Sequence, residues 1–263
     1  MRMSTNFILA FFCLTGWSLA SNAQRTGSTG EYYQITVYHC NSSDQLKSVE
    51  DYLQNAYLPA LHRLGMSQIG VFKPHGVDTV ADKKVFVLLT ARNLDLLAGV
   101  PARLLKDRRY QKDGASLISA PWDKPSFARI ENILLRSFRL APVMKKPQLK
   151  SDRSERVYEL RSYESPSEKI FQNKVDMFNE GGEIALFARL GFNAIFYGEV
   201  ISGSHMPNLM YITSFENRVD RDAHWKAFGA DAQWKELSAR PEFQKNVSKN
   251  EQTFLYPTQY SDY

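Results

Sequence analysis

The sequence predicts an α+β protein in which two tandem ferredoxin-like (βαββαβ) domains pack sheet to sheet as an α+β barrel. Two observations carry this prediction: a set of blocks that recurs after about 125 residues, and the same order of strand and helix patterns in each copy. A four-stranded sheet of this type has helices on one face only. The second copy is therefore expected to cover the other face.

The internal repeat is the main evidence for two domains. Four blocks recur in order at offsets of 124 to 126 residues: 33–38 matches 158–163, 57–65 matches 183–191, 85–93 matches 209–217, and 107–110 matches 231–234. This period is too long for a solenoid and indicates a duplicated domain. We expect domains over 31–141 and 157–258. They are joined by a linker over 142–156, where charges and two prolines gather.

The first copy opens with alternating residues over 33–39, which predict a strand. Apolar residues then recur at steps of three and four from Leu46 to Leu64. They predict an amphipathic helix that Pro59 kinks and Gly65 ends. A second helical stretch is expected before the last strand, and the remaining strands are expected over 67–72, 84–90 and 133–139.

The second copy repeats this order. Its first strand is expected over 157–163, followed by an amphipathic helix from Ile170 to Leu190 that Gly191 ends. Two consecutive glycines at 181–182 should kink that helix. The remaining strands are expected over 193–200, 209–215 and 252–256.

The N-terminus has the pattern of a signal peptide over 1–23. Arg2 gives a positive start, Phe7 to Leu14 is apolar, and Ser21-Asn22-Ala23 fits cleavage before Gln24. The apolar run is shorter than the about 20 residues that a spanning helix needs. We therefore expect an exported protein, periplasmic or secreted, with no transmembrane segment after signal cleavage. An uncleaved membrane anchor is the alternative.

Cys13 raises a second alternative, a lipoprotein. A lipobox has small residues just before its cysteine, whereas Phe11 and Phe12 stand here, and Cys13 lies inside the apolar run. We therefore assign Cys13 to the removed peptide. Cys40 is then the only cysteine of the mature chain and cannot form an intrachain disulfide.

Composition narrows the class of protein. The 263 residues carry a formal net charge of +5, a surplus too modest to indicate a nucleic-acid partner. A mean hydropathy of -0.39 argues against a polytopic membrane protein. Aromatic residues make up 13%, too many for a disordered chain.

The second copy resembles the NIPSNAP family, within the dimeric α+β-barrel group. Tyr158–Tyr163 (YELRSY) matches the Y-E-L-R-x-Y with which the family's domain opens, and Pro207–Tyr211 approximates its L-N-x-x-x-x-W/Y pattern. Asp231–Trp234 resembles its D-P-x-W, with alanine where proline is usual. In the first copy Gln34-Ile35-Thr36 replaces E-L-R. The resemblance implies a fold; the family has no settled activity.

No phosphate loop, dinucleotide fingerprint, nucleophile elbow or zinc-protease motif occurs. The histidines, scattered without an i, i+4 pair, are His39, His62, His75, His205 and His224. A metal site would need distant histidines to converge. We therefore expect no metal and no cofactor.

Strand alternation supplies a candidate ligand-binding set. Glu159, Arg161 and Tyr163 share one face of the strand over 157–163, and Tyr211 lies on the strand over 209–215. If these faces turn toward the space between the copies, Arg161, Tyr163 and Tyr211 would line a pocket. Arg161 would then hold a carboxylate or phosphate. The alternative is that Arg161 pairs with an acid such as Glu159 or Glu183 and ties the copies together.

His224 is the one catalytic candidate. It lies in a helical stretch after Asp220 and is flanked by Ala223 and Trp225. A histidine there can act as acid or base near neutral pH. A packed helix histidine is the alternative, because no partner is visible in the sequence.

The function that follows is the binding of a small ligand or partner between the two sheets of an exported NIPSNAP-like protein. The alternative is a small-molecule enzyme of the α+β-barrel type. The resemblance implies monooxygenase, isomerase or haem-related chemistry for such an enzyme. A homo-oligomer stays open, since each chain can already cover both of its sheets.

Overall fold

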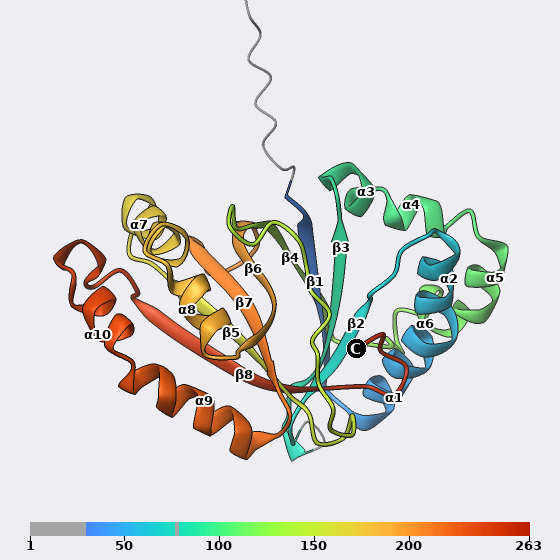
Figure 1. The fold of residues 1–263 in the computed structure, drawn as a ribbon. Helices are drawn as coiled ribbons and strands as arrows, with labels where there is room; N and C mark the ends of the chain where they lie inside the picture. Colours follow the sequence, from blue (N-terminus) through green and yellow to red (C-terminus); the bar gives the residue numbers. More distant parts are fainter. Residues whose placement is uncertain (1–29, 77–78) are drawn as a thin grey trace, which may run out of the picture.

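The computed structural model describes residues 30–76 and 79–263 (Figure 1). Eight strands form a closed barrel in the order β1-β3-β2-β8-β5-β7-β6-β4, with every neighbouring pair antiparallel. The strands are β1 (Tyr32–Cys40), β2 (Gly70–Pro74), β3 (Lys83–Ala91), β4 (Arg129–Ser137), β5 (Val157–Glu164), β6 (Asn193–Ser202), β7 (Asn208–Phe215) and β8 (Lys249–Pro257).

The barrel consists of two four-stranded sheets joined at their edges. The first sheet has the order β4-β1-β3-β2 and the second the equivalent order β8-β5-β7-β6. Strand β2 pairs with β8 at Phe72↔Pro257, and β4 pairs with β6 at Ser137↔Gly198. The expected α+β barrel is confirmed, and closure leaves no unpaired strand edge. The origin of the two halves by duplication stays a prediction.

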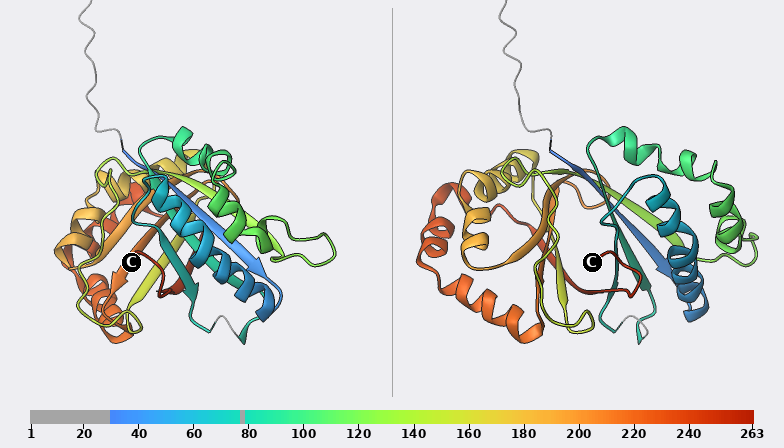
Figure 2. Two further views of the ribbon diagram at one scale, coloured as in Figure 1. Left: turned by 90° about the vertical axis from the view of Figure 1, so that its right-hand side faces the viewer. Right: turned by 45° about the vertical axis from the view of Figure 1, so that its right-hand side comes forward.

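Helices cover the outside of each half (Figures 1 and 2). The first half carries α1 (Ser43–Tyr52), η1 (Leu53–Tyr57), α2 (Leu58–Arg63), α3 (Leu94–Ala98), α4 (Val100–Leu104), α5 (Arg108–Asp113) and α6 (Ala115–Ile118). The second half carries α7 (Glu168–Asn179), α8 (Glu183–Arg189), α9 (Arg218–Ala230), α10 (Ala232–Ala239) and η3 (Pro241–Phe243).

Strand alternation divides the core into three layers. Side chains such as Ile35, Leu160 and Ile212 form one core inside the barrel, to which both halves contribute. Their chain neighbours point outward into two further cores, one under the helices of each half. Every strand therefore has one face in the barrel and one under helices.

The first helix is interrupted ahead of Pro59. Proline has no N–H to donate, and its ring clashes with the carbonyl four residues earlier, which lies at Asn55. The helix widens there into the π-helical turn η1, and α2 follows with Pro59 in its first turn. This widened turn lies just ahead of the position where the sequence predicted a kink.

The helix predicted over 170–190 is two helices. Helix α7 ends at Asn179 and α8 begins at Glu183, with Gly182 at φ +88 between them. This left-handed conformation suits glycine, which lacks the Cβ that makes it costly for other residues. The break turns the chain so that both helices lie on the same sheet (Figure 1).

The linker and the C-terminal segment extend the barrel's pairing. The linker amide of Lys145 donates to the carbonyl of Ile195 in β6 at 2.8 Å. After β8, the amide of Thr258 donates to Val71 at 3.0 Å and that of Asp262 to Ile69 at 3.1 Å. Tyr263 is thereby buried in the interior core.

The signal peptide predicted over 1–23, with Cys13, lies outside the described residues, so cleavage and export stay predictions. In the part of the chain that the structure describes, no helix is long and apolar enough to cross a membrane.

Candidate functional site

Arg161 lies at the centre of a buried polar cluster on β5. Its Nε donates to Glu159 Oε1 at 2.8 Å, and its Nη1 donates to the Tyr163 hydroxyl at 3.0 Å. Its Nη2 lies 2.7 Å from the same Glu159 oxygen. The guanidinium lies over the Trp225 ring, 3.7 Å from its centroid. Each of its nitrogens thus already has a protein partner.

Glu159 is completely buried and is surrounded by donors. Arg221 of α9 donates from Nε and Nη2 to its two oxygens at 2.8 and 2.7 Å, and the Trp225 indole donates at 2.8 Å. Burial alone raises the pKa of Glu159. Hydrogen bonds from Arg221 and the charge of Arg161 outweigh burial, so the pKa lies below its usual 4.5. The carboxylate is therefore ionised at neutral pH.

The three predicted ligand-binding residues are brought together. The hydroxyls of Tyr163 and Tyr211 lie 2.9 Å apart, and Arg161 contacts Tyr163. Tyr211 is fully buried, and burial raises its pKa well above 10.0, so its hydroxyl keeps its proton.

Their expected orientation is wrong. Arg161, Tyr163 and Tyr211 do not face the space between the two halves; they lie on the outer face of β5 and β7, beneath the helices. The interior face of β5 carries Tyr158 and Leu160 instead. The physical reason is that a buried carboxylate needs hydrogen-bond donors. On the outer face, Arg221 and Trp225 of α9 donate to Glu159, whereas the interior of the barrel is apolar.

The pairing alternative for Arg161 is the one observed, with Glu159 as the acid. Glu183 pairs with Lys174 instead, at 3.0 Å. Glu159 in turn accepts from Arg221 and Trp225 of α9, so the cluster holds β5 against α9 within the second half and does not tie the two halves together. Its role as a ligand clamp has no support from this geometry.

His224, the catalytic candidate, lies half-buried on α9. Its Nδ1 is 2.8 Å from the Asp220 carbonyl and 3.2 Å from that residue's carboxylate. Its ring packs against Phe192 and Phe215, each 5.6 Å away between ring centroids. These contacts are those of a packed helix histidine.

One end of the barrel holds a cavity of about 140 Å³ between the two halves, here called the mouth cavity. Its floor is apolar and belongs to the interior core: Val37, Phe86, Ile133, Leu160 and Met210. Its rim is polar and consists of Lys84, Glu131, Ser162, Ser204, His205, Asn208, Glu251 and Thr253. Six strands and the β6–β7 loop contribute to it.

The rim groups are held by neighbours just outside the cavity. His205 Nδ1 lies 3.1 Å from Glu164, and Lys249 lies 2.6 Å from Glu251. Glu131 contacts Arg129 and lies 3.5 Å from the buried His39. Burial raises the pKa of Glu131, but Arg129 and His39 outweigh it and lower the pKa. The rim thus contains the ionised carboxylate of Glu131 together with Lys84.

Sequence reasoning did not single out the mouth residues. The sequence does contain a signal for them. Lys84 lies on the same strand face as the apolar Phe86 and Leu88, and Glu131 lies on the same strand face as Ile133 and Leu135. A charge at the end of an apolar strand face marks the end of a barrel interior. Only the strand order shows that these ends meet.

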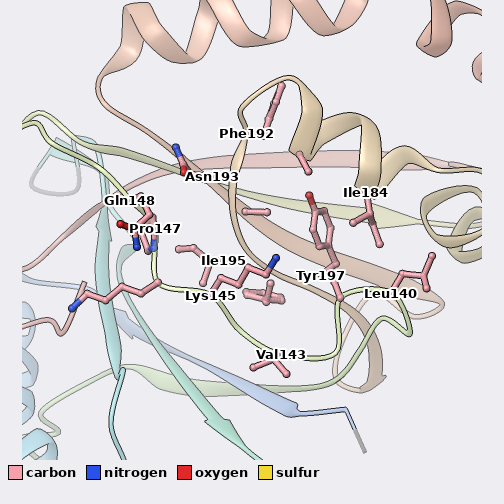
Figure 3. A pocket seen from close by; sticks show the side chains of 15 residues that line it. Leu140, Val143, Lys145, Pro147, Gln148, Ile184, Phe192, Asn193, Ile195 and Tyr197 are labelled. Carbon is pink, nitrogen blue, oxygen red and sulfur yellow. The ribbon is translucent and has the colours of Figure 1, made fainter. Parts of the chain in front are cut away.

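A second cavity, of about 200 Å³, lies outside the barrel between the linker, α8 and the start of β6 (Figure 3). It is here called the linker cavity. Its walls include Val143, Ile184, Phe192 and Tyr197, and Lys145 reaches over it.

No group of three or more histidine, cysteine, aspartate or glutamate side chains is placed to hold a metal ion within residues 30–76 and 79–263. Cys40 is buried and unpaired with any cysteine in that part of the chain.

This architecture defines a class, the α+β barrels in which two four-stranded halves close into one sheet. The chain is similar to a proposed monooxygenase from Lactobacillus acidophilus, with a TM-score of 0.56 at 12% identity over 87% of this chain and 94% of that one. A proposed monooxygenase from Fusobacterium nucleatum (0.54, 8%) and an anthrone oxidase-like protein (0.51, 8%) each match over 87% of this chain and 92% of theirs. At such identities the likeness shows the fold alone.

Residues 158–262 match the NIPSNAP family model. The second half of the chain is therefore a NIPSNAP domain, as the Y-E-L-R-x-Y opening indicated. No curated protein matches the chain significantly.

Proposed function

We propose that this protein binds a small molecule in the mouth cavity, between the two halves of its barrel. The observation that carries the proposal is the cavity itself, with an apolar floor, a charged rim and walls from both halves. Concave sites with apolar walls and a few convergent polar groups are the usual form of ligand sites.

The rim chemistry narrows the ligand. Pockets for drug-sized ligands have about 300–1,000 Å³, so a cavity of about 140 Å³ suits a smaller compound. The Lys84 ammonium and the carboxylates of Glu131 and Glu251 offer both signs of charge. Ser162 and Asn208, already hydrogen bonded to each other at 2.9 Å, offer neutral groups. A compact ligand with an apolar end and both donors and acceptors fits this pattern.

Native mass spectrometry of protein purified from its own host tests the proposal. The wild-type chain should carry a bound mass that Met210→Trp, which fills the floor, abolishes. Ala188→Phe, which fills the linker cavity, is the matched control and should keep that mass. Retention of the same bound mass by folded Met210→Trp would refute the mouth as the site.

An enzyme is the second candidate function. Support comes from the acid and base groups at the mouth, His205 and Glu131, and from the fold likeness to the proposed monooxygenases. The compound recovered from the mouth should be incubated with the protein and followed by mass spectrometry. A new product that His205→Ala fails to form favours catalysis; an unchanged compound favours binding alone.

We also propose that the chain is exported and cleaved before Gln24, as Arg2, the run from Phe7 to Leu14 and Ser21-Asn22-Ala23 suggest. Mass spectrometry of the native protein should find an N-terminus at or near Gln24. A chain that begins at Met1, or a lipid on Cys13, would contradict it.

The two halves are proposed to descend from one duplicated domain. The near-constant offset of the sequence blocks and the equivalent strand orders support this. Because every strand already has two neighbours, copies of the chain can associate only through other surfaces. Sedimentation velocity would measure whether they do.

A further inference from the structure

The walls of the linker cavity are held in place by hydrogen bonds and by a helix. The linker is fixed beside β6 by the bond from the Lys145 amide to the Ile195 carbonyl, and Phe138 donates to the Tyr197 carbonyl at 3.0 Å. Helix α8 forms the opposite wall with Ile184 and Ala188 (Figure 3). The linker, α8 and the start of β6 together enclose about 200 Å³.

The cavity's lining is mainly apolar. It includes Val143, Ile184, Ala188, Phe192 and Ile195. Leu140 and Val143, at its edge, are 50% and 51% exposed. Apolar side chains that remain open to solvent around a concavity are stabilised when an apolar group covers them.

The charged groups that line the cavity are all positive. Its lining contains two lysines, Lys145 and Lys146, and no acidic residue. Neither lysine forms an ion pair with any residue that the structure describes. Figure 3 shows the Lys145 side chain extending across the cavity toward the side where Tyr197 lies.

Tyr197 adds a hydroxyl group to the residues that line the cavity. It is 4% exposed and lines the cavity, and its hydroxyl forms no hydrogen bond with any described residue. Burial raises the pKa of Tyr197, and nearby Glu183 raises it further, so the hydroxyl stays protonated. A ligand oxygen at the cavity would supply this hydroxyl with a hydrogen-bond partner.

From these observations we infer that the linker cavity binds a small amphipathic carboxylate. Its apolar body lies against Ile184, Phe192 and Val143. Its carboxylate accepts from the Tyr197 hydroxyl and pairs with Lys145 and Lys146. This site is separate from the mouth cavity, because Phe196 and the other β6 residues stand between the linker cavity and the barrel interior.

Isothermal titration calorimetry of the full-length protein with octanoate tests the inference. 1-Octanol and octylamine are the matched probes: they keep the chain and remove or reverse the charge. Octanoate should bind at least tenfold more tightly than either. Equal binding of octanoate and 1-octanol, or no octanoate binding at millimolar concentration, would overturn the inference.

Variants locate the site. Ala188→Phe should abolish octanoate binding, and Lys145→Gln/Lys146→Gln should weaken it about tenfold. Tyr197→Phe should weaken it several-fold without lowering Tm, since the hydroxyl has no partner to lose. Met210→Trp in the mouth cavity and Lys112→Gln/Lys235→Gln on other helices are controls that should leave binding unchanged. Octanoate binding that survives Ala188→Phe, or that Met210→Trp removes, would place the ligand elsewhere.

Discussion

At the residue scale, Glu159 is the group on which the second half depends most. It is completely buried and accepts hydrogen bonds from Arg161, Arg221 and Trp225. The sequence identified Glu159 as one acid that Arg161 could pair with. It did not show which face of β5 is interior, because both faces carry large side chains and both are covered. Arg221 and Trp225, 60 or more residues away in the chain, decide the orientation.

Arg161→Leu should lower the free energy of unfolding by about 3 kcal/mol, because removing one partner leaves a buried carboxylate less well compensated. Any ligand bound in the mouth should be lost only when the protein unfolds, since Arg161 faces α9. Urea denaturation gives the stability, and native mass spectrometry below the transition gives the binding. Arg161→Lys, which keeps the charge, should cost less. A well-folded Arg161→Leu that selectively loses its ligand would contradict this account.

The lowered pKa of Glu159 predicts a dependence on pH. A carboxyl whose folded pKa lies below its unfolded value stabilises the protein above about pH 4.5. That contribution disappears as the pH falls through the folded pKa. Unfolding free energies of wild type and Glu159→Gln, measured from pH 7 to pH 3, should therefore converge below about pH 4.5. A difference that stays constant over this range would show that Glu159 is not the titrating group.

At the element scale, the sequence predicted the central strands well. Strand β5 was expected over 157–163 and spans Val157–Glu164; β7 was expected over 209–215 and spans Asn208–Phe215. Strand β4 was expected over 133–139 but spans Arg129–Ser137, so its predicted start is four residues too late. Its first four residues, 129–132, are mostly exposed and contain a single apolar side chain, Ile130, so they lack the alternation by which a strand is recognised.

The break between α7 and α8 depends on Gly182, and this can be measured. Gly182→Ala places a Cβ on a residue at φ +88 and should cost about 1 kcal/mol. Gly229→Ala in α9 is the matched control: its added Cβ meets nothing within 4 Å and its φ is not left-handed, so it should stabilise by about 0.5 kcal/mol. Thermal unfolding of both variants compares them. Equal effects would mean that the backbone conformation at 182 is not the cause.

At the scale of the whole molecule, the barrel closes only because the two halves pair at both of their edges. Duplicated blocks and one-sided helices predicted that the sheets would cover each other. The edge pairing of β2 with β8 and β4 with β6 was beyond sequence reasoning, because it depends on register between distant strands. The mouth cavity was missed for the same reason, since its rim comes from six strands and a loop.

Closure also predicts how the second half behaves alone. A fragment over 150–263 would expose the edges of β6 and β8 and the interior face that carries Leu160, Ile212 and Leu255. It should therefore dimerise or aggregate, because unpaired strand edges form hydrogen bonds with other chains and exposed apolar faces associate in water. Light scattering after size exclusion measures its mass. A soluble monomer with cooperative unfolding would show that the second half needs no cover.

The central claim, that the mouth cavity between the two halves holds a small ligand, is tested most directly by a crystal structure of the protein purified from its own host. We predict non-protein density on the floor of Phe86, Ile133 and Met210, in hydrogen-bond contact with Ser162, Asn208 or Lys84. A mouth closed by its own side chains, with Lys84 paired directly to Glu131 or Glu251 across it, would contradict the claim.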